Sequence, residues 1–125
     1  METPKIPPKI LLVDDERDLV CTMSERMGLR GMTVEVALSG AEAVARLLRE
    51  RFAAVVLDVK MKGMSGLEVL RVIKESYPAV PVIMLTGHDS MQEARACMQA
   101  GAFDYLMKPI ALDDLIAKIH EAVGG

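Results

Sequence analysis

Short aliphatic runs alternate with helical stretches along the chain, and this alternation constrains the fold more than any other feature. Five runs rich in Val, Ile, Leu and Met have the length and composition of buried strands. They lie at residues 9–13, 33–38, 53–57, 81–85 and 103–107. Helical periodicity follows each run, over residues 16–30, 39–51, 67–76, 90–101 and 112–123. This pattern predicts an α/β protein, with a (βα)5 doubly wound parallel five-stranded sheet and helices on both faces.

Local signals add detail to this prediction. Residues 33–38 alternate apolar and polar, which indicates an edge strand, whereas residues 53–57 are continuously apolar, as in a central strand. Ser39 followed by Glu42, and Ser90 followed by Glu93, each predict a capping box at a helix start.

The chain of 125 residues has the length of one domain, which we expect to span residues 9–123. Residues 1–8 contain Pro4, Pro7 and Pro8 without an apolar core, so they predict a flexible N-terminal tail and not a signal peptide.

Composition excludes several classes of function. The net charge of −3, with scattered Lys and Arg, argues against direct nucleic-acid binding. No apolar run approaches the roughly 18 residues needed to cross a membrane. Cys21 and Cys97 lack metal-binding spacing and are expected to be two buried thiols in a reducing compartment. We therefore expect a cytoplasmic protein.

Polar residues stand directly after four of the predicted strands. Asp14 and Asp15 follow the first strand, Asp58 the third, Thr86 the fourth and Lys108 the fifth. In a parallel sheet the carboxyl ends of the strands lie along one edge, which is where open α/β sheets bind ligands. These side chains are therefore expected to share one crevice.

The three aspartates suggest a metal site. Crowded carboxylates raise one another's pKa and destabilise the fold unless a positive charge joins them. Their oxygens suit Mg²⁺ or Mn²⁺. Considered alone, Asp14 and Asp15 fit equally well a helix N-cap with a solvated neighbour.

Thr86 and Lys108 could hold an anion. An ammonium is suited to a phosphate or carboxylate, and the bond to Pro109 is one where a cis peptide is tolerable. The alternatives are an ordinary strand-to-helix turn at Thr86-Gly87 and a surface lysine before a helix-starting proline. The shared placement at strand ends favours a common site.

Four motifs together resemble the receiver domain of two-component response regulators, the chemotaxis-regulator-like family, over residues 9–123. They are Leu11-Leu12-Val13-Asp14-Asp15-Glu16, Val56-Leu57-Asp58 with Met61 and Gly66, Leu85-Thr86-Gly87, and the stretch from Ala100 to Pro109. The resemblance implies a flavodoxin-like fold with strand order 2-1-3-4-5.

The resemblance also implies a role for each site residue. Asp58 would be the phosphoryl acceptor, Thr86 and Lys108 would hold the phosphoryl oxygens, and Tyr105 would swing inward on activation. Mg²⁺ would be bound by Asp14, Asp15, Asp58 and the backbone carbonyl of Lys60.

The implied partners are a histidine kinase or a histidine phosphotransfer protein, and an output domain or effector protein. Phosphorylation would switch the surface formed by the fourth helix, fifth strand and fifth helix, which also allows a homodimer. The domain would be a signalling switch that assists its own phosphorylation and dephosphorylation, not an enzyme for external substrates. The cognate kinase, the output and any further domains are left open.

Three residues depart from the family pattern or lie at the mouth of the site. The family usually has proline where this chain has Lys62. Lys60 and His88 are expected at the rim, where a cation could shield the phosphoryl group from water or orient the attacking water. Shielding is favoured because an ammonium has donors but no acceptor.

Two other classes of function fit the sequence less well. A Mg²⁺-dependent phosphohydrolase with an aspartate nucleophile generally needs a second Asp two residues later, where this chain has Lys60. A flavodoxin-like cofactor binder needs a phosphate-cradling first loop, but Asp14, Asp15 and Glu16 would repel a phosphate. The signalling switch is therefore preferred.

Overall fold

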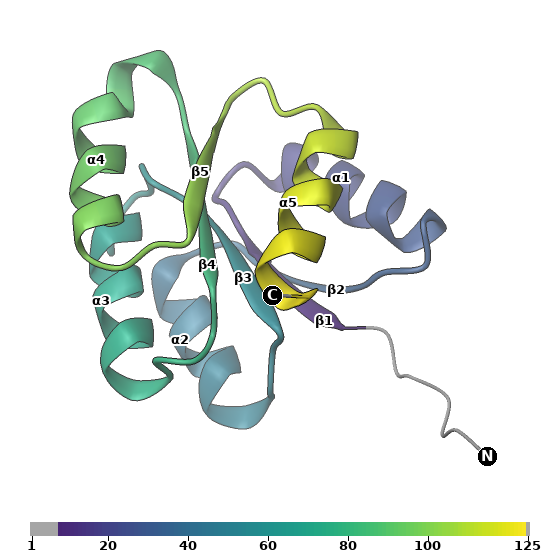
Figure 1. Ribbon diagram of the computed structural model, residues 1–125, viewed down its shortest axis with the longest axis horizontal. Coiled ribbons are helices and arrows are strands. Elements are labelled where there is room, and N and C mark those ends of the chain that lie inside the picture. The colour runs from purple at the N-terminus through teal and green to yellow at the C-terminus, as the bar shows by residue number, and fades with distance from the viewer. Residues whose placement is uncertain (1–7, 125) are drawn as a thin grey trace.

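The computed structural model describes residues 8–124, and they form five strands and five α-helices in alternation (Figure 1). The strands are β1 (Lys9–Val13), β2 (Thr33–Ala37), β3 (Ala54–Asp58), β4 (Val82–Thr86) and β5 (Asp104–Met107). The helices are α1 (Arg17–Leu29), α2 (Gly40–Arg49), α3 (Gly66–Ser76), α4 (Met91–Gln99) and α5 (Leu112–Gly124), and a 3-10 turn, η1 (His88–Ser90), precedes α4. The predicted alternation is confirmed, with element ends shifted by a few residues.

All five strands are parallel and are arranged in the order β2-β1-β3-β4-β5, which confirms the predicted topology. In the register, Val13 lies opposite Leu57, Asp58 opposite Leu85, and Thr86 opposite Met107. The strands therefore end at nearly the same level, so the residues that follow them meet at one edge of the sheet.

Helices cover both faces of the sheet, with α1 and α5 on one face and α2, α3 and α4 on the other (Figure 1). Successive strand residues point to opposite faces, so Leu11 and Val13 pack under α2, α3 and α4 while Ile10 and Leu12 pack under α1 and α5. Because β3 and β4 are covered on both sides, every residue in them is buried. This rigid centre carries Asp58 and Thr86 at its edge.

The helix starts differ in part from the expected capping boxes. Ser39 accepts a hydrogen bond from the Glu42 N–H as predicted, but the Glu42 carboxylate accepts from the Leu38 N–H instead of from Ser39. The capping box predicted at Ser90 is wrong, because Ser90 lies in η1 and its side chain makes no capping bond.

A reciprocal capping box is present instead at the start of α3, between Ser65 and Glu68. The same Ser-x-x-Glu pattern is visible in the sequence there. The pattern does not stand out as a helix start, because the apolar periodicity of that helix begins only at Leu67.

The two cysteines have different environments. Cys97 is buried, as expected, and its burial raises the pKa of the thiol. Cys21 is exposed, which corrects the prediction. It follows the buried Val20 by one residue, and one residue turns an α-helix by about 100°, away from the core.

The sequence predicts a flexible N-terminal tail and no membrane-spanning segment. The predicted tail, residues 1–8, lies outside the described residues except for Pro8. Within residues 8–124, no helix is both long and apolar enough to span a membrane.

Gly66 lets α3 approach the end of β3 closely. Its N–H donates to the Val59 carbonyl at 3.0 Å, and a Cβ atom at this position would lie 2.3 Å from the Asp58 carbonyl oxygen. Backbone on both sides of this contact leaves no room for a side chain. The start of α3 is thereby held against the residue that ends β3.

Gly66→Ala should destabilise the protein by about 1–3 kcal/mol, because the new methyl group would force the backbone of α3 away from β3. The control is Gly28→Ala within α1, where a Cβ meets nothing within 4 Å, and it should stabilise by up to about 1 kcal/mol. Urea unfolding measures both. Equal stability of Gly66→Ala and the parent would contradict the close approach.

Candidate functional site

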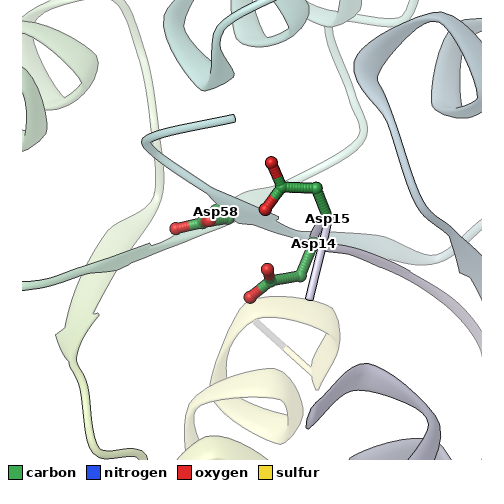
Figure 2. A group of neighbouring side chains, drawn as sticks. All are labelled: Asp14, Asp15 and Asp58. Carbon is green, nitrogen blue, oxygen red and sulfur yellow. The ribbon is translucent and has the colours of Figure 1, made fainter. Parts of the chain in front are cut away.

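Three carboxylates meet at the carboxyl edge of the sheet (Figure 2). Asp58 is the last residue of β3, and Asp14 and Asp15 follow β1 directly. Because Val13 lies opposite Leu57, the next residues, Asp14 and Asp58, are placed side by side. One oxygen from each of the three aspartates lies within 4.8 Å of the others.

The three aspartates differ in their contact with solvent. Asp14 is 1% exposed and Asp58 is 6% exposed, while Asp15 is exposed. Burying an ionised carboxylate is costly unless a cation or hydrogen-bond donors compensate. The two buried carboxylates therefore need a positive partner within the fold.

Lys108 supplies that positive charge. Its Nζ lies 2.9 Å from Asp14 Oδ2 and 3.4 Å from Asp58 Oδ1, and it also lies 3.5 Å from Glu16 Oε1. The bond between Lys108 and Pro109 is cis. The contact with Glu16 was not predicted, since the sequence marked that residue only as part of an acidic run.

The charges in the site shift the pKa values of its members. Burial, with the neighbouring charge of Asp14, raises the pKa of Asp58 to about 6 although Lys108 opposes the change. Burial lowers the pKa of Lys108, but the hydrogen bond to Asp14 and the charge of Asp58 outweigh it and leave that pKa raised. One ammonium thus leaves the acidic group incompletely neutralised.

Asp14 and Asp15 also organise the backbone around them. Asp14 Oδ1 accepts a hydrogen bond from the Glu16 N–H at 3.0 Å, which forms a local turn before α1. The helix N-cap alternative is wrong for this pair, because the N-cap position of α1 is Glu16 and no side chain caps it. Asp15 Oδ2 accepts from the Lys62 N–H at 3.1 Å. The proline usual in the family has no N–H, so Lys62 adds a bond between the β1 and β3 ends.

Thr86 is buried, and its hydroxyl donates to the Gly87 carbonyl at 3.1 Å. Tyr105 is half-buried and packs with Met84 in the layer below α2, α3 and α4. Since strand residues alternate between faces, Thr86 points to the same face as Met84, two residues earlier. The structure therefore places the two predicted switch residues on one face of the sheet.

Both predicted rim residues, Lys60 and His88, are exposed. The Lys60 Nζ lies 3.3 Å from Asp89 Oδ2, and this hydrogen bond lowers the pKa of Asp89. His88 is the first residue of η1. Nothing in the sequence indicates Asp89 as the partner of Lys60, because the two residues belong to different loops.

The donor set can hold a metal ion. Three carboxylates of which two are buried, with a single ammonium among them, leave an excess of negative charge in a small space. Hard divalent cations bind through oxygen ligands of this type. The residues present therefore fit such an ion.

Comparison with known proteins agrees with the fold. The family model described as the response regulator receiver domain matches residues 10–120. Response regulator MprA of Mycobacterium sp. (strain KMS) is 40% identical over 115 residues, which cover 92% of this chain and 50% of that protein. MprA of Mycobacterium leprae (strain TN) is 41% identical over 112 residues, covering 90% and 49%.

Solved structures are similar over nearly the whole chain. The receiver domain of NtrX from Brucella abortus has a TM-score of 0.87 at 31% identity, with 92% of this chain and 98% of that chain covered. A CheY-like receiver domain protein from Methanospirillum hungatei JF-1 has a TM-score of 0.90 at 31% identity, with 95% of each chain covered.

A parallel sheet of this order, with acidic residues and a lysine at its carboxyl edge, defines a receiver-type α/β domain. The chain belongs to the response regulator receiver domain family, and it is accordingly a signalling switch of a two-component system. It spans about half the length of the curated relatives it matches.

Asp58→Asn should stabilise the metal-free protein in a pH-dependent way. The folded pKa of about 6 lies above the ordinary value of 3.8, so the parent loses stability as pH rises through this interval. The variant should exceed the parent by at most about 3 kcal/mol at pH 8 and by about a third of that at pH 4.5.

Urea unfolding in a chelator at the two pH values measures this difference. The control, Asp18→Asn on the exposed surface of α1, should change stability by roughly 0.5 kcal/mol or less at either pH. A gain for Asp58→Asn that does not grow between pH 4.5 and pH 8 would show that Asp58 is not under electrostatic strain.

Proposed function

We propose that this receiver domain, over residues 9–123, accepts a phosphoryl group on Asp58 in a Mg²⁺-dependent transfer from a histidine kinase or a histidine phosphotransfer protein. The observation that carries the proposal is the buried Asp58 carboxylate at the end of β3, grouped with two further carboxylates and 3.4 Å from the Lys108 ammonium. Membership of the receiver family supports it.

The transfer is a displacement at phosphorus. An oxygen of the Asp58 carboxylate forms the new P–O bond, and the P–N bond to the donor imidazole breaks with its electron pair remaining on that nitrogen. Such transfers depend mainly on positioning and on neutralising the phosphoryl oxygens. Lys108, already beside Asp58, is placed to neutralise one of them.

Asp14, Asp15, Asp58 and the Lys60 carbonyl would hold the Mg²⁺, for which Mn²⁺ is a chemically similar substitute. When bound, the cation supplies positive charge that keeps Asp58 ionised and offsets the charge of the phosphoryl oxygens. The local acidic excess and the Lys62 N–H bond to Asp15 support this arrangement, because they gather and orient ligands of the required type. The same residues would assist hydrolysis of the aspartyl phosphate.

Switching would run through Thr86 and Tyr105. The phosphoryl group adds roughly −1.5 to −2 charges, by analogy with phosphoserine. We infer that the Thr86 hydroxyl leaves the Gly87 carbonyl to donate to a phosphoryl oxygen, and that Tyr105, on the same face, moves into the space behind it.

The surface of α4, β5 and α5 would report this change to an output domain or effector protein, and it would also be the face of any homodimer. We place these events in the cytoplasm, without direct contact to nucleic acid or membrane. The formal net charge of −3 argues against contact with nucleic acid or an anionic membrane surface.

Asp58→Asn should abolish covalent labelling by acetyl phosphate, because the amide cannot form an acyl phosphate. Intact-mass measurement followed by peptide mapping detects the label. The control Glu75→Gln, at the exposed end of α3, should label like the parent. Labelling at the parental level in Asp58→Asn, or a labelled peptide that contains Asp14 or Asp15, would refute the assignment.

Asp15→Ala should lose most of the thermal stabilisation that Mg²⁺ gives the parent. For the parent we expect a rise in Tm of roughly 5 °C at ten times the Kd, since the cation binds the native state and relieves carboxylate repulsion. Thermal unfolding over a Mg²⁺ series measures it, and Glu75→Ala should respond like the parent. An unchanged Mg²⁺ response in Asp15→Ala would remove Asp15 from the metal site.

A further inference from the structure

An exposed ion pair joins the two loops at the mouth of the site. Lys60 leaves β3 two residues after Asp58, and Asp89 lies in η1, after β4. The Lys60 Nζ is 3.3 Å from Asp89 Oδ2 across 29 residues of sequence. The side chains are 58% and 77% exposed, so water and salt have free access to the pair.

The other oxygen of Asp89 faces the segment that begins with Thr86. Asp89 Oδ1 accepts a hydrogen bond from the Ser90 hydroxyl at 3.2 Å. It also lies 2.9 Å from the place where a Cβ atom on Gly87 would stand. The Asp89 carboxylate is therefore folded back onto the residue that follows Thr86.

Hydrogen bonds within residues 86–90 hold this segment in a turn. The Gly87 carbonyl accepts both the Thr86 hydroxyl and the Ser90 N–H, each at 3.1 Å. The Thr86 hydroxyl must leave that carbonyl before it can donate to anything bound at Asp58. Any contact that holds Gly87 in place thus favours the arrangement in which Thr86 is turned away.

Lys60 can reach either of two negative groups. Two residues of chain span at most about 7 Å, so its flexible side chain can extend toward the end of Asp58 as well as toward Asp89. A phosphoryl group on Asp58 would bring roughly −1.5 to −2 charges to that place, against one charge on a solvated carboxylate. The ammonium would then be drawn from Asp89 to the phosphoryl oxygens.

We propose that Asp89 is a positioning residue which, through its ion pair with Lys60, holds residues 86–90 in the unphosphorylated arrangement. This ion pair is called the latch. A phosphoryl group on Asp58 draws Lys60 away from Asp89 and so opens the latch. The proposal rests on the proposed function. It adds a second link between phosphorylation and Thr86, separate from the direct hydrogen bond of Thr86 to the phosphoryl group.

The latch is tested first in the unphosphorylated protein by NMR. The reporters are the Thr86 methyl group and the Lys108 amide, which donates to the Thr86 carbonyl at 2.7 Å. The chemical shifts of these two reporters are measured in the parent without and with beryllofluoride, which serves as the phosphoryl mimic. These two spectra define the unphosphorylated and the phosphorylated end points. Asp89→Asn and Lys60→Gln, altered in different loops, should both move these resonances toward the beryllofluoride end point without any beryllofluoride present.

Conservative variants and salt distinguish the ion pair from general disruption. Asp89→Glu and Lys60→Arg keep the charges, so the reporter chemical shifts in these variants should stay near those of the parent without beryllofluoride. High salt screens exposed pairs, so 1 M NaCl should move the parent toward the Asp89→Asn position and leave Asp89→Asn itself unmoved. Asp113→Asn, which removes the similarly exposed pair with Arg30, should leave both reporters in place.

The rate of Asp58 labelling by acetyl phosphate provides the second test. Asp89→Asn should label about two- to fivefold faster than the parent, the range expected for loss of an exposed ion pair. Two outcomes would overturn the latch, provided that the parent labels normally. One is that the reporter chemical shifts in both Asp89→Asn and Lys60→Gln equal those of the parent, and the other is that Asp89→Asn labels at the parental rate. A parent that neither labels nor responds to beryllofluoride would instead overturn the proposed function itself.

Discussion

Two buried carboxylates that share one ammonium are the interaction on which the rest of this structure depends. Asp14 and Asp58 are almost fully removed from water, and Lys108 contacts both. The attraction to a single cation cannot offset the desolvation of two anions, which is why the pKa of Asp58 is raised to about 6. This imbalance of charge lies at the edge of two fully buried strands, and it would favour the binding of a further positive charge there.

The site combines a rigid base with a loosely held rim. Asp58 and Thr86 terminate strands that are buried along their whole length, so their backbone positions are fixed by the core. Lys60 and Asp89 belong to exposed loops and are joined by one solvent-accessible contact. Local motion is easiest where few apolar contacts must break. A charge added at Asp58 would therefore move the rim and leave the sheet in place.

Much of the fold was predictable because buried strands and amphipathic helices have different periods. The continuous apolar run of residues 53–57 correctly indicated a central strand. Strand order came from family resemblance, since alternation alone does not order parallel strands. The errors were local. Ser90 was predicted to cap α4 but lies within η1, and Cys21 faces solvent, because a short turn and a one-residue rotation leave little trace in the pattern of apolar residues.

The sequence by itself determined the class of fold and the set of residues at the strand ends, because both follow from local periodicity and from the rule that parallel strands end together. Only the tertiary structure decided how those residues are paired: the Lys62 N–H bonded to Asp15, the Thr86 hydroxyl turned to Gly87, and Lys60 joined to Asp89. The physical reason is that most of these contacts link loops far apart in the chain. Their geometry depends on how closely the helices pack against the sheet, which no single segment encodes.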